Sequence, residues 1–408
     1  EHIETIYLGS GCFWGAEKGY ESLDGVIDAE SGYANGYGIS PNYRSIIQFK
    51  NKFNDNNFAE VVKVTFNSNA IEVVDILKHF FETHDPTQLN RQGNDVGTQY
   101  RSTILYINEI QKELAEKIME DSGGRLKIEL YPGMQLGGKP PALYDQIRDG
   151  VIDGGWALPA YTPGRFPESE AFELPFISSK SAEKTSQAAW EYSQKYLLDR
   201  MSDVHLIAVH VHGSGIVHTK GGPVTGPADF AGKKLRGPSR AANNLLEAMG
   251  ATAVGMPVPA FPEALSKGVV EGGVIPWEIT LPLKVHELTD GHSEVAGEKA
   301  MYNTFFIWAM NKDSYANLPD DLKAVIDANS GLGASAWAGR AMDTGDTKAL
   351  AVISKGSNPI ITMSQEATDA IKAIAEPQIS EWVKSMDAAG LPGQAMLDDA
   401  RALIAKYN

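Results

Sequence analysis

The sequence changes character between Ile107 and Asp121, and this change constrains the fold more than any other feature of the chain. Before it, a glycine-rich turn at residues 9–15 holds Cys12, the single cysteine among 408 residues. After it, segments with helical and strand periodicity alternate to the C-terminus. A chain of this length usually forms two to four compact units, at roughly 100–200 residues each. We therefore expect two dissimilar domains, at residues 1–107 and 108–408.

The composition argues against several classes of function. With 43% hydrophobic and 22% charged residues, the chain can build ordinary globular cores. Its net charge of −16 leaves no basic stripe to neutralise phosphates, so we expect no nucleic-acid partner. No apolar run approaches the roughly 20 residues that cross a bilayer, and we expect no signal peptide in the sequence. One cysteine cannot form an internal disulfide, so cysteine usage does not decide the compartment.

Cys12 lies at a predicted strand-to-helix turn, between a strand at residues 3–8 and a helix at residues 14–23. The glycines of this turn are spaced one residue too far apart for the G-x-G-x-x-G dinucleotide motif. A helix N-terminus would favour the thiolate, which is the reactive form of cysteine. The alternative is an inert, buried cysteine, which is a common environment for this residue type.

Six segments that follow one another in the first hundred residues decide between these alternatives. Together they resemble the peptide-methionine sulfoxide reductase A family, and the resemblance runs from about residue 3 to about residue 106. The segments are 11–15, 31–36, 41–44, 59–62, 84–86 and 90–102.

The resemblance implies thiol chemistry at Cys12 on methionine sulfoxide in peptides. The thiolate would attack the sulfoxide sulfur, release methionine and leave a sulfenic acid on Cys12. By the same resemblance, Glu60 would protonate the sulfoxide oxygen, Tyr43 and Tyr100 would hold that oxygen, and Asp95 would lie nearby. A carboxyl beside an apolar, aromatic wall should have a raised pKa, which suits a general acid.

Two aromatic residues and two departures from the family complete this expectation. Phe13 and Trp14 would cradle the substrate methyl group, although ordinary core packing is the alternative. Phe58 stands where the family usually has a histidine. The family also continues for several dozen residues, often with resolving cysteines that this chain lacks. We therefore expect no cofactor and an external reductant, thioredoxin or a small thiol, for Cys12.

Residues 108–121 have the spacing of an amphipathic helix, with Ile110, Leu114 and Ile118 on one face and glycines 123 and 124 as its end. Alternation at residues 126–130 then predicts a half-buried strand. The families that the two parts of the chain resemble each have a helix at this point, so we expect one continuous helix. Its apolar stripe should face the C-terminal sheet.

Residues 108–408 resemble the solute-binding subunit of tripartite ATP-independent periplasmic (TRAP) transporters. The expected fold class is therefore α/β: a truncated α+β reductase-like segment, then a two-lobed periplasmic-binding-protein-like fold that lacks its first strand. Alternating helices and strands predict a mainly parallel sheet with helices on both faces. The unpaired edge left by the missing strand would invite aggregation unless something covers it. The matching segments are 116–118, 123–126, 136–138, 148–154, 174–176, 231–236, 250–252, 264–273, 310–312 and 318–319.

This resemblance implies a small carboxylate ligand and TRAP membrane subunits as partners. The arginine that matches Arg236 clamps the ligand in that family, and a planar guanidinium suits a carboxylate because it forms two parallel bonds. Trp277 and Glu278 fall where further ligand contacts lie, as an apolar wall and as a group for an amine, a hydroxyl or a cation. Further candidate aromatics of the cleft, equally consistent with core packing, are Trp156, Tyr161 and Phe305.

Three functions remain open from the sequence. The leading one is solute binding in the periplasm; the second is a thiol-dependent reductase, usually cytoplasmic; the third is a chimera in which neither site works. His210 and His212 would share one face of a strand, as zinc ligands do, but no third ligand is close in the sequence. We therefore expect no metal.

Overall fold

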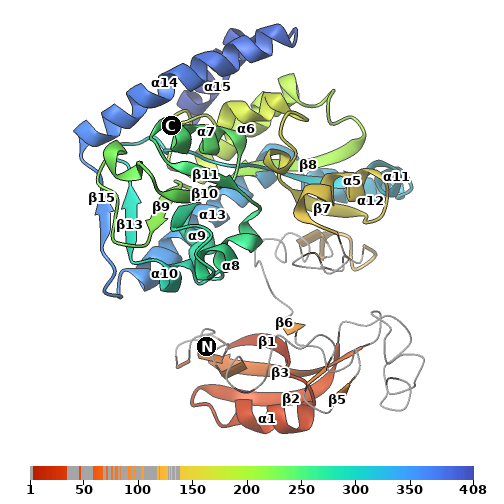
Figure 1. The fold of residues 1–408 in the computed structure, drawn as a ribbon. Coiled ribbons are helices and arrows are strands. Elements are labelled where there is room, and N and C mark those ends of the chain that lie inside the picture. The colour runs from red at the N-terminus through yellow and green to blue at the C-terminus, as the bar shows by residue number, and fades with distance from the viewer. Residues whose placement is uncertain are drawn as a thin grey trace. The chain divides into compact units, whose positions relative to one another are not determined.

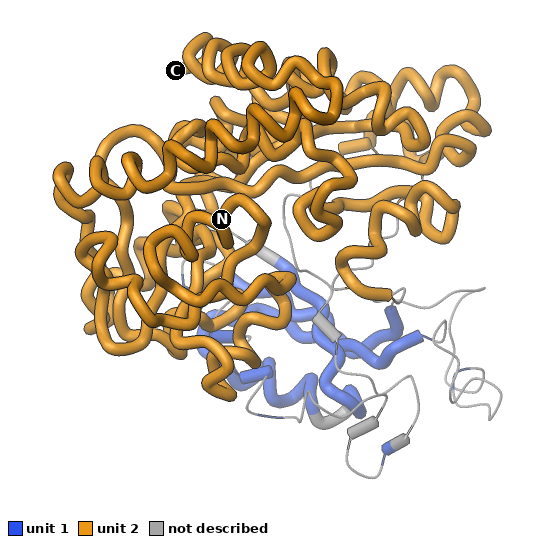
Figure 2. Tube along the Cα trace, turned by 45° about the horizontal axis from the view of Figure 1, so that its top comes forward, with its two compact units in different colours: residues 1–112 blue, residues 113–408 orange. Residues whose placement is uncertain are grey.

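The computed structural model shows two compact units, Glu1–Lys112 and Glu113–Asn408 (Figure 2). None of the helices it describes is long and apolar enough to span a membrane. The residues described are 3–34, 46, 58–67, 70–71, 75–76, 79–80, 83, 91–92, 95–96, 103–104, 117–118, 120–126, 128, 130, 134 and 138–408.

The N-terminal unit contains an antiparallel sheet in the order β2-β3-β1-β6 (Figure 1). Its helix α1 (Phe13–Glu21) packs on this sheet, because Phe13 and Tyr20 share a core with Leu8 and Val62. The predicted strand at residues 3–8 and the helix that follows Cys12 are confirmed. The strands are β1 (Ile3–Gly9), β2 (Val26–Ala34), β3 (Ala59–Asn67) and β6 (Thr103–Ile104), with a separate pair, β4 (Arg91–Gln92) and β5 (Asp95–Val96).

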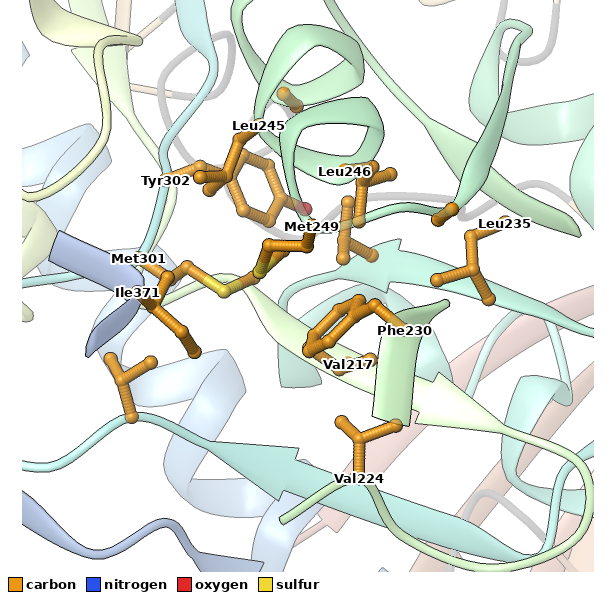
Figure 3. Packing of buried hydrophobic residues seen from close by; sticks show 14 of the residues in the cluster. Val217, Val224, Phe230, Leu235, Leu245, Leu246, Met249, Met301, Tyr302 and Ile371 are labelled. Carbon is orange, nitrogen blue, oxygen red and sulfur yellow. The ribbon is translucent and has the colours of Figure 1, made fainter. Parts of the chain in front are cut away.

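The C-terminal unit contains a six-stranded sheet in the order β11-β10-β12-β9-β13-β15. Helices cover both of its faces, as the sequence predicts. On one face, α7 (Arg240–Ala248) and α14 (Gln365–Ala388) pack on β9, β10 and β12 around Phe230 and Leu245 (Figure 3). On the other, α8 and α10 pack against Ile275. The strands are β9 (Ile216–Thr219), β10 (Lys234–Gly237), β11 (Thr252–Gly255), β12 (Gly272–Ile275), β13 (Gly291–Glu294) and β15 (Ile360–Thr362).

A second, three-stranded sheet of this unit has the order β7-β14-β8 and is antiparallel throughout. The expectation of a mainly parallel sheet is therefore wrong here. In the six-stranded sheet it holds for three of the five strand pairs. Strands β9 and β14 are antiparallel to the strands on both sides of them. The crossover helices that join parallel strands therefore do not connect these pairs. The strands are β7 (Gly154–Ala157), β8 (Val204–Val211) and β14 (Phe305–Asn311).

Helices complete the C-terminal unit, and the long pair α14 and α15 lies side by side (Figure 1). The N-termini of α6, α7 and α14 are each capped by a serine side chain that accepts a backbone N–H. The helices are α5 (Leu143–Arg148), α6 (Ala182–Tyr196), α7 (Arg240–Ala248), α8 (Phe261–Ser266), α9 (Trp277–Thr280), α10 (Val285–Leu288), α11 (Lys312–Ala316), α12 (Asp320–Ala328), α13 (Gly331–Ile353), α14 (Gln365–Ala388) and α15 (Gly393–Tyr407).

Strand β8 forms an edge of the three-stranded sheet as the structure describes it. Two of its backbone N–H groups, those of Val209 and Val211, donate to the hydroxyls of Ser335 on α13 and Ser186 on α6, at 3.1 and 3.0 Å. Side chains of two helices therefore accept these backbone N–H groups, which a further strand would otherwise accept. The aggregation risk expected for an open edge is reduced at this position.

The join between the two parts is described from Lys117 onward. Lys117, Ile118, Glu120 and Asp121 are helical, and Ile118 packs against Ile326 of α12, as the apolar stripe predicts. The other two stripe residues, Ile110 and Leu114, lie outside the described residues.

The described residues of the stretch 126–130 are not in the strand that its alternation predicts. Leu126, Ile128 and Leu130, the described residues of this stretch, are not in a strand. Leu126 and Ile128 still pack in the same hydrophobic cluster as Ile326. The apolar side chains of the alternating pattern are therefore partly buried without a strand. A strand also needs a neighbour for its backbone, which the sequence period alone does not provide.

Candidate functional sites

The N-terminal site is built around Cys12, which is exposed and is the N-cap residue of α1. The first backbone N–H of this helix, that of Phe13, donates to the Glu60 carboxylate at 3.3 Å. Glu60 is 2% exposed and lies on β3, opposite Tyr33 of β2. The ring of Tyr33 packs 5.2 Å from that of Phe13. The fold thus brings a thiol, a buried carboxyl and two aromatic rings to one end of the sheet.

Glu60 has the electrostatics expected of a proton donor. Burial raises the pKa of Glu60 above its ordinary value; the Phe13 N–H opposes this shift, and the nearby Asp95 carboxylate adds to it. Asp95 itself is exposed, on β5. Of the predicted neighbours, Tyr43 and Tyr100 lie outside the described residues, and for Trp14 only the backbone, within α1, is described.

The C-terminal site is built around Arg236, at the carboxyl end of the parallel strand β10. Leu235 points into the core of Figure 3, so Arg236, the next residue, points to the opposite face of the sheet. Its Nε and Nη2 donate to the Met256 carbonyl at 3.0 and 2.9 Å, and its Nη1 donates to the Val274 carbonyl at 3.0 Å. These bonds fix the plane of the guanidinium. The Tyr161 hydroxyl is a further hydrogen-bond partner.

The charge of Arg236 lacks a carboxylate partner among the described residues. The side chain is 1% exposed, and no described acidic group lies within 4.0 Å of it. Burial lowers the pKa of Arg236, and the tyrosines Tyr161 and Tyr302 oppose the shift. A buried cation held only by neutral groups is costly, so its surroundings favour an added anion.

An aromatic wall leads from the three-stranded sheet toward Arg236. The ring of Trp156 is stacked on that of Phe306 at 4.8 Å, and its Nε1 donates to His210 Nε2 at 2.8 Å. His212 continues the wall, with its ring 6.1 Å from Phe306 and 5.4 Å from Tyr302. Burial lowers the pKa of His212 to about 4, and the nearby Arg236 charge contributes to this shift.

His210 and His212 both belong to this aromatic wall, and all four of their ring nitrogens have hydrogen-bond partners within the protein. His210 Nε2 accepts from Trp156, and His212 Nε2 bonds the Thr304 hydroxyl at 3.1 Å. Both Nδ1 atoms contact backbone carbonyls. Within the described part of the chain, no group of three or more metal-ligating side chains is found.

Two further predicted cleft residues, Trp277 and Phe305, are buried. Trp277 packs in a core with Ile216 and Ile353, and its ring contacts His218 and His292. Phe305 is fully buried, with its ring 6.2 Å from Phe172. Apolar side chains gain most from complete burial, and a role of these two residues in ligand binding stays a prediction.

The sequence analysis missed Asp346, Tyr302 and the role of Gly213. Asp346, on α13, accepts the backbone N–H of Glu278 at 2.8 Å. Glu278, which the sequence did single out, therefore lies beside another carboxyl. An added methyl group at Gly213 would lie 1.9 Å from an Asp346 oxygen, so a larger residue would have to displace that carboxylate. The Gly-Ser-Gly pattern at residues 213–215 was the one available signal for this close approach.

Comparisons with known proteins separate the two parts. Residues 4–128 match the family described as peptide methionine sulfoxide reductase, and residues 97–385 match bacterial extracellular solute-binding protein, family 7. The peptide methionine sulfoxide reductase MsrA of Saccharolobus solfataricus is 46% identical over 134 residues, which are 32% of this chain and 73% of that protein.

Solved structures resemble the C-terminal part. A TRAP solute-binding protein from a marine metagenome, specific for aromatic acid ligands and solved with metahydroxyphenylacetate, is 44% identical, with a TM-score of 0.72 over 74% of this chain and 94% of that one. A TRAP solute-binding protein from Rhodoferax ferrireducens T118, solved with copurified benzoate, is 45% identical, with a TM-score of 0.71 over 73% of this chain and 92% of that one. The chain therefore belongs to the bacterial extracellular solute-binding protein family 7, joined at its N-terminal end to a segment of the peptide methionine sulfoxide reductase family.

Proposed function

We propose that the C-terminal unit binds a small aromatic carboxylate at Arg236 and delivers it to TRAP membrane subunits. The observation that carries this proposal is the buried guanidinium of Arg236, which has neutral hydrogen-bond partners and no described counter-ion. A ligand carboxylate would supply the missing negative charge. In a site shielded from water, such a charge-assisted pair is stronger than at the surface.

The donor geometry of Arg236 supports a bidentate clamp. A guanidinium has five N–H donors, and carbonyls take three of them. The remaining two are the number that a carboxylate needs for two parallel bonds. The Tyr161 hydroxyl also hydrogen-bonds the guanidinium. When a ligand enters, this hydroxyl would either bond the same N–H group together with the carboxylate or be displaced from it.

The ring of the ligand has a matching surface in the aromatic wall. Trp156, Phe306 and His212 are planar groups that can pack against a benzene ring, and offset or edge-on packing of such rings is favourable. The two similar solved proteins hold metahydroxyphenylacetate and benzoate, which have this combination of ring and carboxylate. We infer the same ligand class for this chain.

The test is calorimetry with benzoate on the full chain and on variants of Arg236. Arg236→Met should abolish measurable binding, and Arg236→Lys should weaken it by at least about 30-fold, because truncating one partner of a buried pair costs roughly 2–5 kcal/mol. Arg340→Met is the matched control, since Arg340 forms an exposed ion pair with Glu183. Benzoate binding by Arg236→Met at the parental affinity would place the clamp elsewhere.

The family fixes the compartment of this unit only coarsely. Membership of an extracellular solute-binding family places the unit outside the cytoplasm. We propose the periplasm, where TRAP solute-binding proteins meet their membrane subunits.

A second function is proposed for the N-terminal unit, reduction of methionine sulfoxide in peptides. The specific observation is an exposed cysteine at the start of α1, one residue from a backbone N–H that Glu60 accepts. Cys12 would attack sulfur, and Glu60, with its raised pKa, would protonate the oxygen. Tyr43, Tyr100, Phe13, Trp14 and Asp95 remain the proposed neighbours of the substrate.

The test is reduction of a peptide methionine sulfoxide with dithiothreitol. Cys12→Ser should lose all activity, and Glu60→Gln should lose most of it, because general acids typically contribute about 10²–10⁴-fold. With no second cysteine in the chain, thioredoxin should be a poorer donor than the small thiol. Activity of Cys12→Ser at the parental level would refute the nucleophile assignment.

A further inference from the structure

Two carboxyl groups are held side by side near the Arg236 site. Asp346 of α13 accepts the Glu278 N–H at 2.8 Å, at the start of α9. An added methyl group at Gly345 would lie 2.8 Å from the Glu278 Cβ, so the two backbones are in close contact. Backbone packing, and not flexible side chains, therefore keeps this acid pair, Glu278 and Asp346, together.

Three buried polar atoms without a hydrogen-bond partner belong to residues in or next to the segment 213–215. They are Ser214 Oγ, Tyr302 Oη and Asn303 Oδ1, in side chains that are 6%, 1% and 0% exposed. Gly213 lies against the Asp346 carboxylate, and an added methyl group at Gly215 would lie 1.9 Å from the Tyr302 ring. Unsatisfied buried polar atoms are rare and costly, so their concentration here points to a bound group.

The acid pair can both donate and accept a hydrogen bond near neutral pH. Burial raises the pKa of Glu278 to about 8, and the Asp346 carboxylate adds to this shift. Burial likewise raises the pKa of Asp346 to about 7. A pair that shares a proton suits a hydroxyl group, which itself donates and accepts. A cation would instead favour two ionised carboxylates.

Tyr302 connects the acid pair to the carboxylate clamp. Its hydroxyl interacts electrostatically with Arg236 and also with Asp346 and Glu278. We infer that Glu278, Asp346 and Tyr302 form a second ligand subsite, which binds a ring hydroxyl of the aromatic carboxylate that Arg236 holds. The preferred ligand is then a hydroxylated aromatic acid, and this inference rests on the proposed function.

The experiment compares the dissociation constants of benzoate and of 2-, 3- and 4-hydroxybenzoate by calorimetry. The parent should bind one hydroxylated isomer at least about tenfold more tightly than benzoate, since a lost buried hydrogen bond commonly costs about this factor. In Asp346→Asn and in Tyr302→Phe this preference should fall below about threefold. Tyr302→Phe removes only one oxygen, so it keeps the test valid if Asp346→Asn folds poorly. Asp369→Asn, in an exposed pair with Lys372, is the control.

Each outcome of this comparison has a definite consequence. A preference that disappears in both variants supports the subsite. If benzoate binding requires Arg236 while the hydroxyl preference is absent or unchanged in the variants, the subsite is refuted and the proposed function stands. A preference that appears only with added Na⁺ or Ca²⁺ replaces the hydroxyl subsite with a cation site. If the parent binds none of the four acids, both proposals fail.

Discussion

Buried charged groups in this chain have two different roles, and their partners distinguish them. Arg236 is buried among neutral groups and needs a counter-ion, which is expected of a binding residue. Glu173 is also buried, but its carboxylate accepts the Phe305 N–H at 3.0 Å and a bond from Ser239. It therefore joins β14 to the start of α7 and has a structural role. Burial raises the pKa of Glu173 to about 8, although these two bonds oppose the shift.

The first prediction concerns Glu173→Gln and pH. Because the folded pKa of about 8 exceeds the ordinary 4.5, the contribution of Glu173 to stability is complete below about pH 4.5 and is lost as pH rises through 8. Glutamine keeps an acceptor oxygen and does not ionise. Relative to the parent, the variant should therefore gain on the order of 2–4 kcal/mol in free energy of unfolding between pH 5 and pH 8.

Urea unfolding of both proteins at several pH values measures this difference. The amide of Glu173→Gln can change the free energy of unfolding by an amount that does not depend on pH. This amount cancels, because only the pH dependence of the difference between the two proteins is compared. Glu366→Gln, at an exposed position of α14, is the control. A difference between parent and Glu173→Gln that stays flat from pH 5 to pH 8 would contradict the raised pKa.

At the scale of elements, α13 is the helix that ties the C-terminal unit together. Ser335 of this helix bonds the edge of β8, and Asp346 bonds the start of α9. Asp343 accepts the N–H groups of Ala182 and Glu183 at the start of α6, at 2.7 and 3.1 Å. The helix can approach α6 this closely because Gly339 faces it: an added methyl group there would lie 2.5 Å from the Ala182 carbonyl oxygen.

The second prediction compares two glycines of α13. Gly339→Ala should lower the free energy of unfolding by about 1–3 kcal/mol, because the new methyl group meets a fixed carbonyl and must push the helices apart. Gly333→Ala, in the same helix, has nothing within 4 Å and should raise stability by up to about 1 kcal/mol. Urea unfolding followed by circular dichroism separates the two. Equal effects at both sites would show that the α13–α6 contact is not tight.

At the scale of the whole molecule, the chain consists of two compact units with separate cores. Residues just after the boundary belong with the C-terminal unit. Ile118 packs against Ile326, Asp121 accepts from the Asn329 amide at 2.9 Å, and Arg125 pairs with Asp321. The sequence-based boundary at residues 107 and 108 and the structural one after Lys112 therefore differ by a few residues.

The third prediction is that limited proteolysis cuts at or before Asn108 and leaves a resistant C-terminal fragment of about 300 residues. The reason is that this unit has the larger buried core and that residues 117–126 are anchored to α12. Benzoate should slow further digestion of the fragment, since a ligand that binds only the folded state stabilises it. Mass spectrometry of the products identifies the cut. Survival of an N-terminal fragment, with the rest digested, would reverse this prediction.

The sequence alone determined the two families, the first strand and the helix after Cys12, and the identities of Cys12, Glu60 and Arg236 as candidates. Local periodicity and motif spacing are properties of neighbouring residues, so they are visible without a fold. Only the tertiary structure decided that β14 runs antiparallel between β7 and β8, that Trp277 is a core residue, and that Asp346 bonds the Glu278 backbone. These contacts join residues far apart in the chain. They depend on which faces pack together and how closely, which no local pattern encodes.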